Sequence, residues 1–462
     1  MTVNINLNTE SIKNKDPEKP IKKSKSIKKK RFLIVTIIFL IIIGTLFLCN
    51  HFFGEKTGLK LGITDIFNPI KANPQLQKDS SGIYTNILLV GIDTREGNYG
   101  LQNTDTIILL SYNHEKNEIV LFSIPRDFFV EVPEQGRYSK INGIYAIGES
   151  ISKDNGMKFL KAVVEEVTTK EIQYYGMINL RGFVDLIDTL GGIEVDVENP
   201  FTDHRYPLEG AEHRYQTISF EAGPQIMDGK TALRFVRSRH SLNYGEGSDF
   251  ARAKRQQRVI IGLRDKLLSS ETLLNPRKGL RILEILDKNI KYSDFTNEEV
   301  QAVIKILQKE NMQTYSFVLD PNLANFKLVT DRRIAGDLYT ISPLAGLSNY
   351  RDIHEYISYA YKKPLLYSED PSILIYDVGL GREESLEIIE ILQEDYPYIQ
   401  IQFMGTIMND IRDSYLYKTT EEENDLDSKM GKYFSIEMTE KPEFMQAVTP
   451  NGDYIILLGS ND

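Results

Sequence analysis

The chain has 462 residues, 41% of them hydrophobic and 26% charged, so it is long enough for two or three folded domains of about 150 residues. Its formal net charge of -10 excludes a general nucleic-acid-binding protein, which needs a basic surface to meet the phosphate backbone. The single cysteine, Cys49, excludes disulfides and cysteine-based metal sites from the rest of the chain.

The charge is unevenly distributed along the chain. Residues 1–31 contain 10 Lys and Arg against 3 Asp and Glu, which leaves 45 against 62 for the remainder. This basic segment has no apolar periodicity and is predicted to be a disordered cytoplasmic tail. The acidic balance therefore belongs to the later part of the chain.

An uncharged apolar run follows the basic tail. Residues 32–53 (FLIVTIIFLIIIGTLFLCNHFF) contain no Asp, Glu, Lys or Arg, and about 20 apolar residues cross a bilayer as a helix. Because Lys and Arg beside a span stay in the cytoplasm, the pattern predicts a single-pass cell-membrane protein whose C-terminal bulk is extracellular. A cleaved signal peptide is the less favoured alternative, since its apolar region is usually about 7–15 residues long. An exported chain with so little cysteine is typical of Gram-positive bacteria.

Residues 54–82 contain several Gly, Pro and Ser residues and are predicted to be an extracytoplasmic spacer. Three short apolar runs follow and are typical of strands buried on both faces: NILLVG (86–91), TIILLS (106–111) and IVLFSI (119–124). Helical patterns follow at 157–167 and 183–190, and the second ends at a Gly-Gly pair typical of a helix C-terminus. Strands that alternate with helices predict a layered α/β domain.

The sequence after residue 251 is mostly helical in pattern, with helices expected at 259–269, 280–286 and 298–308. A second domain boundary is expected between residues 361 and 371. Beyond it, the pattern predicts a small α/β unit with strands at 372–376, 399–404 and 454–458 and a helix at 383–393. An acidic loop near Glu422 interrupts this unit and is assigned no function.

Charged residues flank the three apolar strands. Asp93 and Arg95 follow the first strand, Asp105 precedes the second, and Arg126 and Asp127 follow the third. Ligands of open α/β sheets bind beyond the carboxyl ends of strands, so these side chains can form one site if the strands are neighbours. The alternative is that they are ordinary strand-end charges that pair with each other.

A second cluster is richer in arginine. Residues 232–260 (ALRFVRSRHSLNYGEGSDFARAKRQQRVI) contain six arginines, whose planar forks match the oxygens of a pyrophosphate: Arg234, Arg237, Arg239, Arg252, Arg255 and Arg258. Arg237 and Arg239 are expected on one face of a strand. Asp249 is expected to begin a helix that carries Arg252 and Gln256 on one face.

Other residues of this stretch are expected to have simpler roles. Arg255, Arg258 and Lys254 are predicted to lie on a solvated, salt-bridged helix face. The segment around Tyr244, Gly245 and Gly247 is predicted to be a flexible loop that can cover a ligand.

Carboxylates combined with arginines, without a Cys or His cluster, favour Mg²⁺ (or Mn²⁺) holding a phosphate, with Asp93 and Asp105 as the metal ligands. Phosphoryl transfer needs mainly positioning and charge neutralisation, which these residues can supply. The triplet Gly229-Lys230-Thr231 is not a P-loop, because the required glycine is replaced by Pro224. Neither a G-x-S-x-G nor an H-E-x-x-H motif is present.

The sequence resembles the LytR-CpsA-Psr family of Gram-positive envelope proteins. The matching motifs occur in the family's order: NILLVGIDTR (86–95), TDTIILLS (104–111), FSIPRD (122–127), KINGIYAIG (140–148), LIDTLGGIEVDV (186–197), and ALRFVRSR (232–239) followed by SDFARAKRQQ (248–257). On this resemblance, residues 83–365 form the catalytic domain with a helical extension, and residues 371–462 form a LytR-type C-terminal domain.

The resemblance implies an α-β-α sandwich with an apolar tunnel for a polyprenyl chain, and we expect the helices at 157–167 and 183–190 to line it. It also implies transfer of a teichoic acid or capsular polysaccharide from a polyprenyl-pyrophosphate carrier to peptidoglycan. Carried over by position, the metal ligands are Asp93 and Asp105, and the pyrophosphate-binding residues are Arg126, Arg237, Arg239, Arg252 and Gln256, with Asp249 supporting Arg252.

One position departs from the family's pattern. Many members have an arginine where this chain has Asn103, so one phosphate contact is either missing or supplied by Arg95.

The expected activity is that of a membrane-anchored, extracytoplasmic phosphotransferase. Its catalytic group comprises Asp93, Arg126, Asp127 and Arg252, with Asp93 or Asp127 as the general base. One alternative is a lipid-pyrophosphate hydrolase that uses the same site. The other is a membrane-bound transcriptional attenuator, although residues 1–31 are too short for a DNA-binding domain.

Overall fold

The structure is a computed structural model that describes residues 75–93, 103–208, 214–243, 245–273, 275–293, 295–307, 309, 312–321, 326–334, 337–407, 411–420, 424–446 and 451–460. These residues all belong to one compact unit, residues 59–462. The predicted tail and membrane span lie outside the described residues, as do Arg95 and Tyr244. Within the described part of the chain, no helix is long and apolar enough to cross a membrane.

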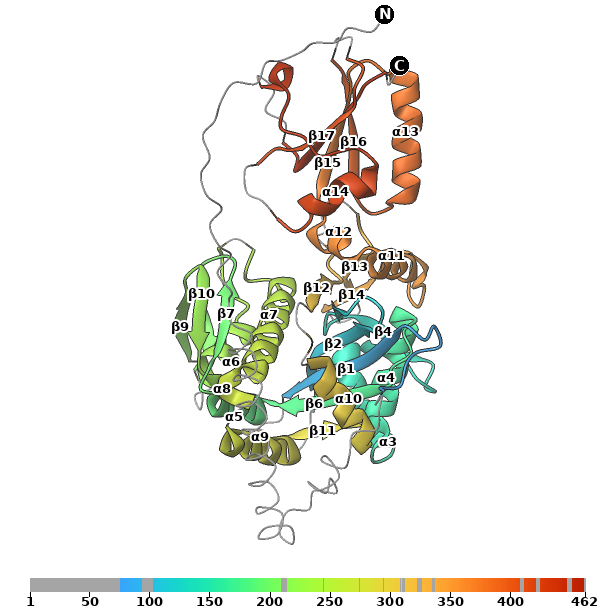
Figure 1. The fold of residues 1–462 in the computed structure, drawn as a ribbon. Coiled ribbons are helices and arrows are strands. Elements are labelled where there is room, and N and C mark those ends of the chain that lie inside the picture. The colour runs from blue at the N-terminus through green and yellow to red at the C-terminus, as the bar shows by residue number, and fades with distance from the viewer. Residues whose placement is uncertain are drawn as a thin grey trace, which may run out of the picture. The chain divides into compact units, whose positions relative to one another are not determined.

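A six-stranded mixed sheet forms the centre of the catalytic region, in the order β11-β6-β1-β2-β3-β12 (Figure 1). The three predicted apolar strands are confirmed as an antiparallel meander in which β2 lies between β1 and β3. Strand β6 runs parallel to β1, and β12 runs parallel to β3. The strands are β1 (Tyr84–Asp93), β2 (Asn103–Asn113), β3 (Glu118–Ser123), β6 (Tyr174–Asn179), β11 (Ile290–Tyr292) and β12 (Gln313–Val318).

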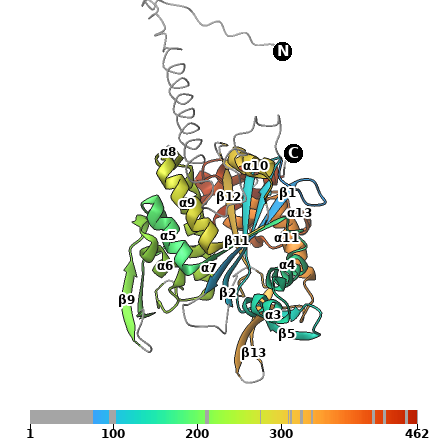
Figure 2. The same ribbon diagram turned by 90° about the horizontal axis from the view of Figure 1, so that it is seen from below.

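Both faces of this sheet are buried, as the apolar runs predicted. Alternate side chains such as Leu88 and Val90 pack with helix α4 (Asn155–Thr168), near α3 (Ile144–Ile151). The opposite face packs against α7 (Asp249–Leu268) and α10 (Asn297–Leu307). Figure 2 shows α3 and α4 on one side of the sheet and α7 on the other. The catalytic region is therefore a mixed α/β fold with a helix-sheet-helix arrangement of layers.

A second apolar cluster lies beside the central sheet. It joins α5 (Leu180–Leu190) and α6 (Gly229–Arg237) to two small antiparallel pairs, β7 (Ile193–Val197) with β10 (Gly223–Met227), and β8 (Phe201–Pro207) with β9 (Tyr215–Phe220). Helix α5 begins after Asn179, whose side chain accepts a hydrogen bond from the Gly182 amide, and it ends at Gly191 in the left-handed conformation. The predicted helix end at the Gly-Gly pair is confirmed.

The helices after α7 are α8 (Ser270–Leu273) and α9 (Pro276–Asn289). A hairpin of β4 (Phe129–Val132) and β5 (Arg137–Lys140), with the 3₁₀ turn η1 (Ile141–Gly143), separates β3 from α3. A further hairpin, β13 (Val329–Ile334) with β14 (Leu338–Pro343), precedes α11 (Arg351–Lys362) and α12 (Pro364–Glu369).

Residues 372–458 contain a separate four-stranded sheet in the order β16-β15-β18-β17. The predicted strands are found as β15 (Ser372–Asp377), β16 (Gln400–Thr406) and β18 (Tyr454–Leu458), and β17 (Tyr415–Lys418) is added at one edge. The predicted helix is α13 (Arg382–Asp395), which lies beside β15 and β16 (Figure 1). The remaining elements are α14 (Asp427–Phe434) and η2 (Glu443–Met445).

Candidate active site

The structure brings the carboxylates at the ends of β1 and β2 to one edge of the central sheet. Strand β1 runs antiparallel to β2, so Asp93 at its end lies opposite Asn103 at the start of β2. The register shifts between Gly91 and Ile92, which leaves Asp105 as the extra residue of a β-bulge. A bulge turns its residue out of the regular alternation of the strand. Asp105 is 38% exposed and Asp93 is 18% exposed.

Arg126 connects three carboxylates at this edge. It lies in the loop after β3, which ends beside the start of β2 because the two strands are antiparallel. Its Nη1 donates to Oδ1 of Asp105 over 3.1 Å, and its Nε lies 3.4 Å from an oxygen of Asp127 and 3.4 Å from an oxygen of Asp249. Burial opposes the charge of this guanidinium, but Asp249, Asp105 and Asp127 outweigh it and raise the pKa of Arg126. A permanent cation is thus held at the centre of the cluster.

Asp249 joins Arg126 to Arg252. Helix α7 begins at Asp249, as predicted, and the preceding Ser248 caps it by accepting a hydrogen bond from the Ala251 amide over 3.0 Å. One Asp249 oxygen contacts Arg126, and the other lies 3.1 Å from Nη1 of Arg252. Burial lowers the pKa of Arg252, Asp249 opposes this shift, and Arg126 adds to it. Two guanidinium groups are therefore oriented by one carboxylate.

The prediction of a strand for Arg237 and Arg239 is wrong. Residues 229–237 form helix α6, because Asp228 caps it by accepting from the Thr231 amide and its buried residues recur at helical spacing. Arg237 is the last residue of this helix, and its Nη2 lies 3.8 Å from Oδ2 of Asp93. The end of α6 therefore places Arg237 beside the predicted metal ligand.

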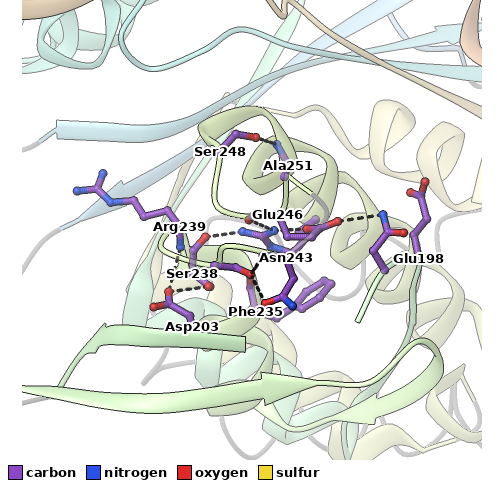
Figure 3. Close-up of polar contacts among 12 residues, drawn as sticks. Glu198, Asp203, Phe235, Ser238, Arg239, Asn243, Glu246, Ser248 and Ala251 are labelled. Carbon is purple, nitrogen blue, oxygen red and sulfur yellow. Dashed lines mark hydrogen bonds and ion pairs between the residues drawn. The ribbon is translucent and has the colours of Figure 1, made fainter. Parts of the chain in front are cut away.

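Arg239 follows α6 in an extended segment. Its backbone amide donates to Oδ2 of the buried Asp203, an oxygen that also accepts from the hydroxyl of Ser238. Figure 3 shows the Arg239 side chain extending away from this cluster. Asp203 thus fixes the backbone at Arg239, whose side chain is exposed. Asp203 was not among the predicted site residues, since it lies in β8, 35 residues before Ser238.

Asp127 is held between two cations. Besides Arg126, its Oδ1 lies 2.6 Å from Nζ of Lys140, at the end of β5, and its side chain is only 10% exposed. Both carboxylate oxygens of Asp127 therefore lie against cationic groups, which fixes the position of this side chain. The role of general base stays a prediction. Lys140 was not among the predicted site residues, although it begins the KINGIYAIG motif.

Arg255 is not on a solvated face, so that prediction is wrong. Its side chain is 2% exposed and donates to the backbone oxygens of Phe235, Ser238 and Glu246 and to the Glu246 carboxylate. Its guanidinium also lies over the ring of Phe201, 4.7 Å from the ring centre. Arg258, by contrast, pairs with Glu198 in a partly exposed position, as predicted.

The α6–α7 loop (residues 238–248) is fastened on both sides of Tyr244. Figure 3 shows Glu246 within the polar network that connects this loop to neighbouring segments. A side-chain carbon at Gly247 would lie only 2.1 Å from the carbonyl oxygen of Ser241, so only glycine fits there. The described residues of this loop, which was predicted to cover a ligand, therefore contact α7 and each other through hydrogen bonds.

The two glutamines of the RQQ motif face different surroundings. Gln256 is half-buried on α7, one turn after Arg252, as the helical spacing predicted. Gln257 is fully buried, and its amide donates to the hydroxyl of Ser123 and to the carbonyl of Phe317 over 2.8 Å each. Gln257 therefore fixes α7, the helix that carries Arg252, against β3 and β12.

The residues present fit a magnesium ion. Among the described residues, no group of three or more His, Cys, Asp and Glu forms a metal cage. Mg²⁺, however, typically takes only one or two carboxylates and completes its shell with water and substrate phosphate oxygens. Asp93 and Asp105 come from adjacent strands at the same edge, with the bulge turning Asp105 outward. Asn103 lies opposite Asp93 and places a neutral amide beside this carboxylate.

The fold and the site together define a mixed α/β protein with an arginine-rich, carboxylate-bearing site at one sheet edge. The profile of the LytR_cpsA_psr family matches residues 65–329, more than half of the chain, and the chain belongs to this family. It is 30% identical over 278 residues to the polyisoprenyl-teichoic acid–peptidoglycan teichoic acid transferase TagU of Oceanobacillus iheyensis, covering 59% of this chain and 78% of that protein. TagU of Bacillus subtilis is 29% identical over 266 residues, covering 57% of this chain and 78% of the relative.

Solved structures match a similar share of this chain. TagV of B. subtilis covers 61% of this chain and 97% of its own, with 23% identity and a TM-score of 0.45. A structure of TagT bound to LI-WTA covers 63% of this chain and 96% of its own, with 20% identity and a TM-score of 0.42. As a member of a family of transferases, the chain is an enzyme.

Proposed function

We propose that the protein is a membrane-anchored phosphotransferase that moves a glycopolymer of the teichoic acid or capsular polysaccharide type from a polyprenyl-pyrophosphate carrier to peptidoglycan. The observation that carries this proposal is the linked set of Asp105, Arg126, Asp249 and Arg252 at one sheet edge. Relatives named as teichoic acid transferases support the class of polymer. The site needs no protein nucleophile, because phosphoryl transfer relies on positioning and charge neutralisation.

In this proposal Asp93 and Asp105 hold Mg²⁺ (or Mn²⁺), which when bound neutralises charge on the pyrophosphate oxygens. Arg126 and Arg252 are oriented by Asp249 before substrate arrives, so their donors need little reorganisation during the reaction. Arg237 and Arg239 reach the same ligand from the end of α6 and the segment after it. Gln256 adds an amide donor from α7, and Arg95 completes the predicted set.

The transfer forms one bond and breaks one. A sugar hydroxyl of peptidoglycan attacks the phosphorus that carries the glycan, and the bond from this phosphorus to the bridging oxygen of the pyrophosphate breaks. Polyprenyl phosphate leaves with the bonding electron pair, while the hydroxyl proton passes to a base in the site. The arginines stabilise the negative charge on the oxygens around the attacked phosphorus. This stabilisation is greatest for donors that are aligned before the reaction.

The location follows from the predicted membrane span. Residues 32–53 anchor the protein in the cell membrane, residues 1–31 lie in the cytoplasm, and the catalytic region lies outside, where peptidoglycan is assembled. A lipid-linked donor held in the same membrane would reach the site without leaving the bilayer surface.

The test is incubation of the full-length protein with a lipid-pyrophosphate-linked glycan, Mg²⁺ and peptidoglycan. Glycan covalently attached to the wall material supports transfer, whereas free phosphorylated glycan, formed equally without acceptor, would show a hydrolase instead. The variants Asp105→Ala and Arg252→Ala should abolish product, and Asp265→Ala, an exposed acidic position on the same helix α7, should not. Full activity in either site variant would refute the assignment of the site.

A further inference from the structure

A hollow of about 300 Å³ lies beside the start of β3, away from the arginine cluster, and most of its charged lining is basic. Five lysines from three separate parts of the chain line it. Lys116 comes from the turn between β2 and β3, Lys362 and Lys363 from the junction of α11 and α12, and Lys429 and Lys432 from α14. We call it the lysine pocket.

The positive charge of the lysine pocket is only partly compensated. Among the described residues, Glu118 is the one carboxylate that lines it. The ammonium groups of Lys362 and Lys363 lie over the rings of Tyr359 and Tyr396, 5.4 Å and 3.8 Å from the ring centres, and for the described residues no ion pair is recorded for any of the five lysines. The ammonium of Lys116 instead donates to the backbone oxygen of Lys362 over 3.1 Å. Like charges held around one hollow repel one another, so a bound anion would stabilise this arrangement.

The remaining lining favours a ligand with sugar-like parts. Tyr315 is buried and Tyr433 is half-buried in this lining, and Leu365 adds an apolar contact. Tyrosine rings combine a flat apolar face with a hydroxyl group, which suits the mixed surface of a sugar or polyol. The floor of the pocket can therefore contact uncharged repeat units while the lysines meet their charges.

A second hollow of about 410 Å³ adjoins the lysine pocket and shares Tyr315 and Leu365 with it. Its lining is mainly of hydrogen-bonding side chains: Gln313, Thr314, Ser316, Ser368 and Asn424, with the acidic Glu369 and Asp425. Because the two hollows adjoin, they provide an extended binding surface in which only the first is lined by lysines. Such a surface fits an elongated chain, with phosphates at the lysines and uncharged repeat units in the second hollow, better than a single compact anion.

We propose that the lysine pocket binds the anionic backbone of a phosphodiester-linked glycopolymer, at a place separate from the cleft where its pyrophosphate end reacts. The choice of polymer rests on the proposed function. A polymer with repeated phosphates can contact lysines from three elements at once, and each contact releases counterions. Binding at a second place raises the local concentration of a long donor near the cleft, so the pocket acts on KM and leaves kcat unchanged.

The first experiment measures binding of a short poly(glycerol phosphate) to the full-length protein in detergent, at low and at physiological salt. The double variant Lys429→Gln/Lys432→Gln should bind about fivefold to tenfold more weakly, with a shallower dependence on salt. The pair Lys429→Arg/Lys432→Arg should retain binding, which excludes misfolding as the cause. Lys153→Gln/Lys305→Gln, at two exposed lysines on other parts of the chain, is the matched control and should bind normally.

Two results would overturn the proposal: unchanged polymer binding in the Lys429→Gln/Lys432→Gln variant, or equal weakening in the control pair. A lipid headgroup as the occupant is also distinguishable. In that case the double variant would lose binding to phosphatidylglycerol vesicles and keep its binding to the polymer, which contradicts the proposal.

The second experiment separates this proposal from the proposed function. Transfer is compared for a donor that carries a long polymer and for one that carries only its first sugars. The Lys429→Gln/Lys432→Gln variant should raise KM for the long donor alone and leave kcat unchanged for both. An equal KM for the long donor in variant and wild type would refute the proposal that the lysine pocket binds the polymer. If the wild type transfers no glycan but still binds the polymer through these lysines, the proposed transferase function is refuted and polymer binding by the lysine pocket is not.

Discussion

Replacing Arg255 with methionine removes the buried charge that joins α6, the α6–α7 loop and α7. Methionine fills much of the same volume and leaves the Glu246 carboxylate, 11% exposed, without its partner. Removing one member of a buried ion pair costs about 3–5 kcal/mol, because the other charge stays buried and unpaired. The carbonyls of Phe235 and Ser238 also lose a donor, which adds to this cost.

Amide hydrogen exchange measures this loss of stability locally, in the α6–α7 loop. The amides of Glu246 and Ser248 donate to the carbonyls of Asn243 and Gly245 in the native loop. Since each 1.4 kcal/mol corresponds to about tenfold, a loss of 3 kcal/mol should speed their exchange by about 100-fold. Amides of β1, in the middle of the sheet, should be affected far less.

The control is Arg258→Met on the same helix, whose partner Glu198 is 56% exposed. An exposed pair contributes about 0–1 kcal/mol, so exchange in the loop should change less than about fivefold. Adding Glu246→Gln to Arg255→Met should restore part of the lost protection, because the unpaired charge is removed. Equal exchange in the Arg255→Met and Arg258→Met variants would refute the reasoning that Arg255 fastens the loop.

The remaining predictions concern the site and the pH dependence of folding. Asp249→Asn should lower kcat about 100-fold, because Arg126 and Arg252 lose their common anchor, while Asp265→Asn on the same helix should leave it unchanged. Asp105→Asn should raise the Mg²⁺ concentration needed for half-maximal activity at least about tenfold, and an unchanged requirement would remove Asp105 from the metal site. Burial, with Lys78 and Lys309, lowers the pKa of His114 to about 4. The unfolded chain protonates this histidine near pH 6.5, so its contribution to stability is present above that pH and is lost toward pH 4. With a discount for solvent screening at this half-buried site, His114 should contribute about 1 kcal/mol to the loss of unfolding free energy between pH 7 and pH 5, and in urea titrations the His114→Gln variant should lose that much less than wild type.

The sheet and the position of the site could be predicted from local sequence. Apolar runs of four to six residues bounded by charges indicated β1, β2 and β3, and the strand-end charges indicated one edge. Adjacent antiparallel strands bring the end of one beside the start of the next, so the contact of Asp105 with Arg126 follows directly. The bulge that turns Asp105 outward depends on pairing between strands and has no local signal.

The roles of individual arginines could not be predicted in the same way. Arg252 and Arg255 are three residues apart on α7, yet one contacts the site carboxylates and the other is buried under the α6–α7 loop. The side of a helix on which a loop packs is decided by tertiary contacts, here through Glu246 and Phe201. Arg237 and Arg239 alternate with Val236 and Ser238, and this spacing of two predicts a strand although Arg237 ends helix α6. Asp228, which caps α6, is the local signal for the helix.

The most direct test of the site is Mg²⁺-dependent binding of a short-chain polyprenyl pyrophosphate to the full-length protein. We expect wild type and Asp265→Asn to bind the pyrophosphate in a Mg²⁺-dependent manner and to bind the matching monophosphate more weakly, since fewer oxygens meet the guanidinium groups. Arg252→Ala and Asp105→Asn should each lose most of this binding. Equal binding of the pyrophosphate by wild type and by Arg252→Ala would contradict the assignment of the sheet edge as the pyrophosphate site.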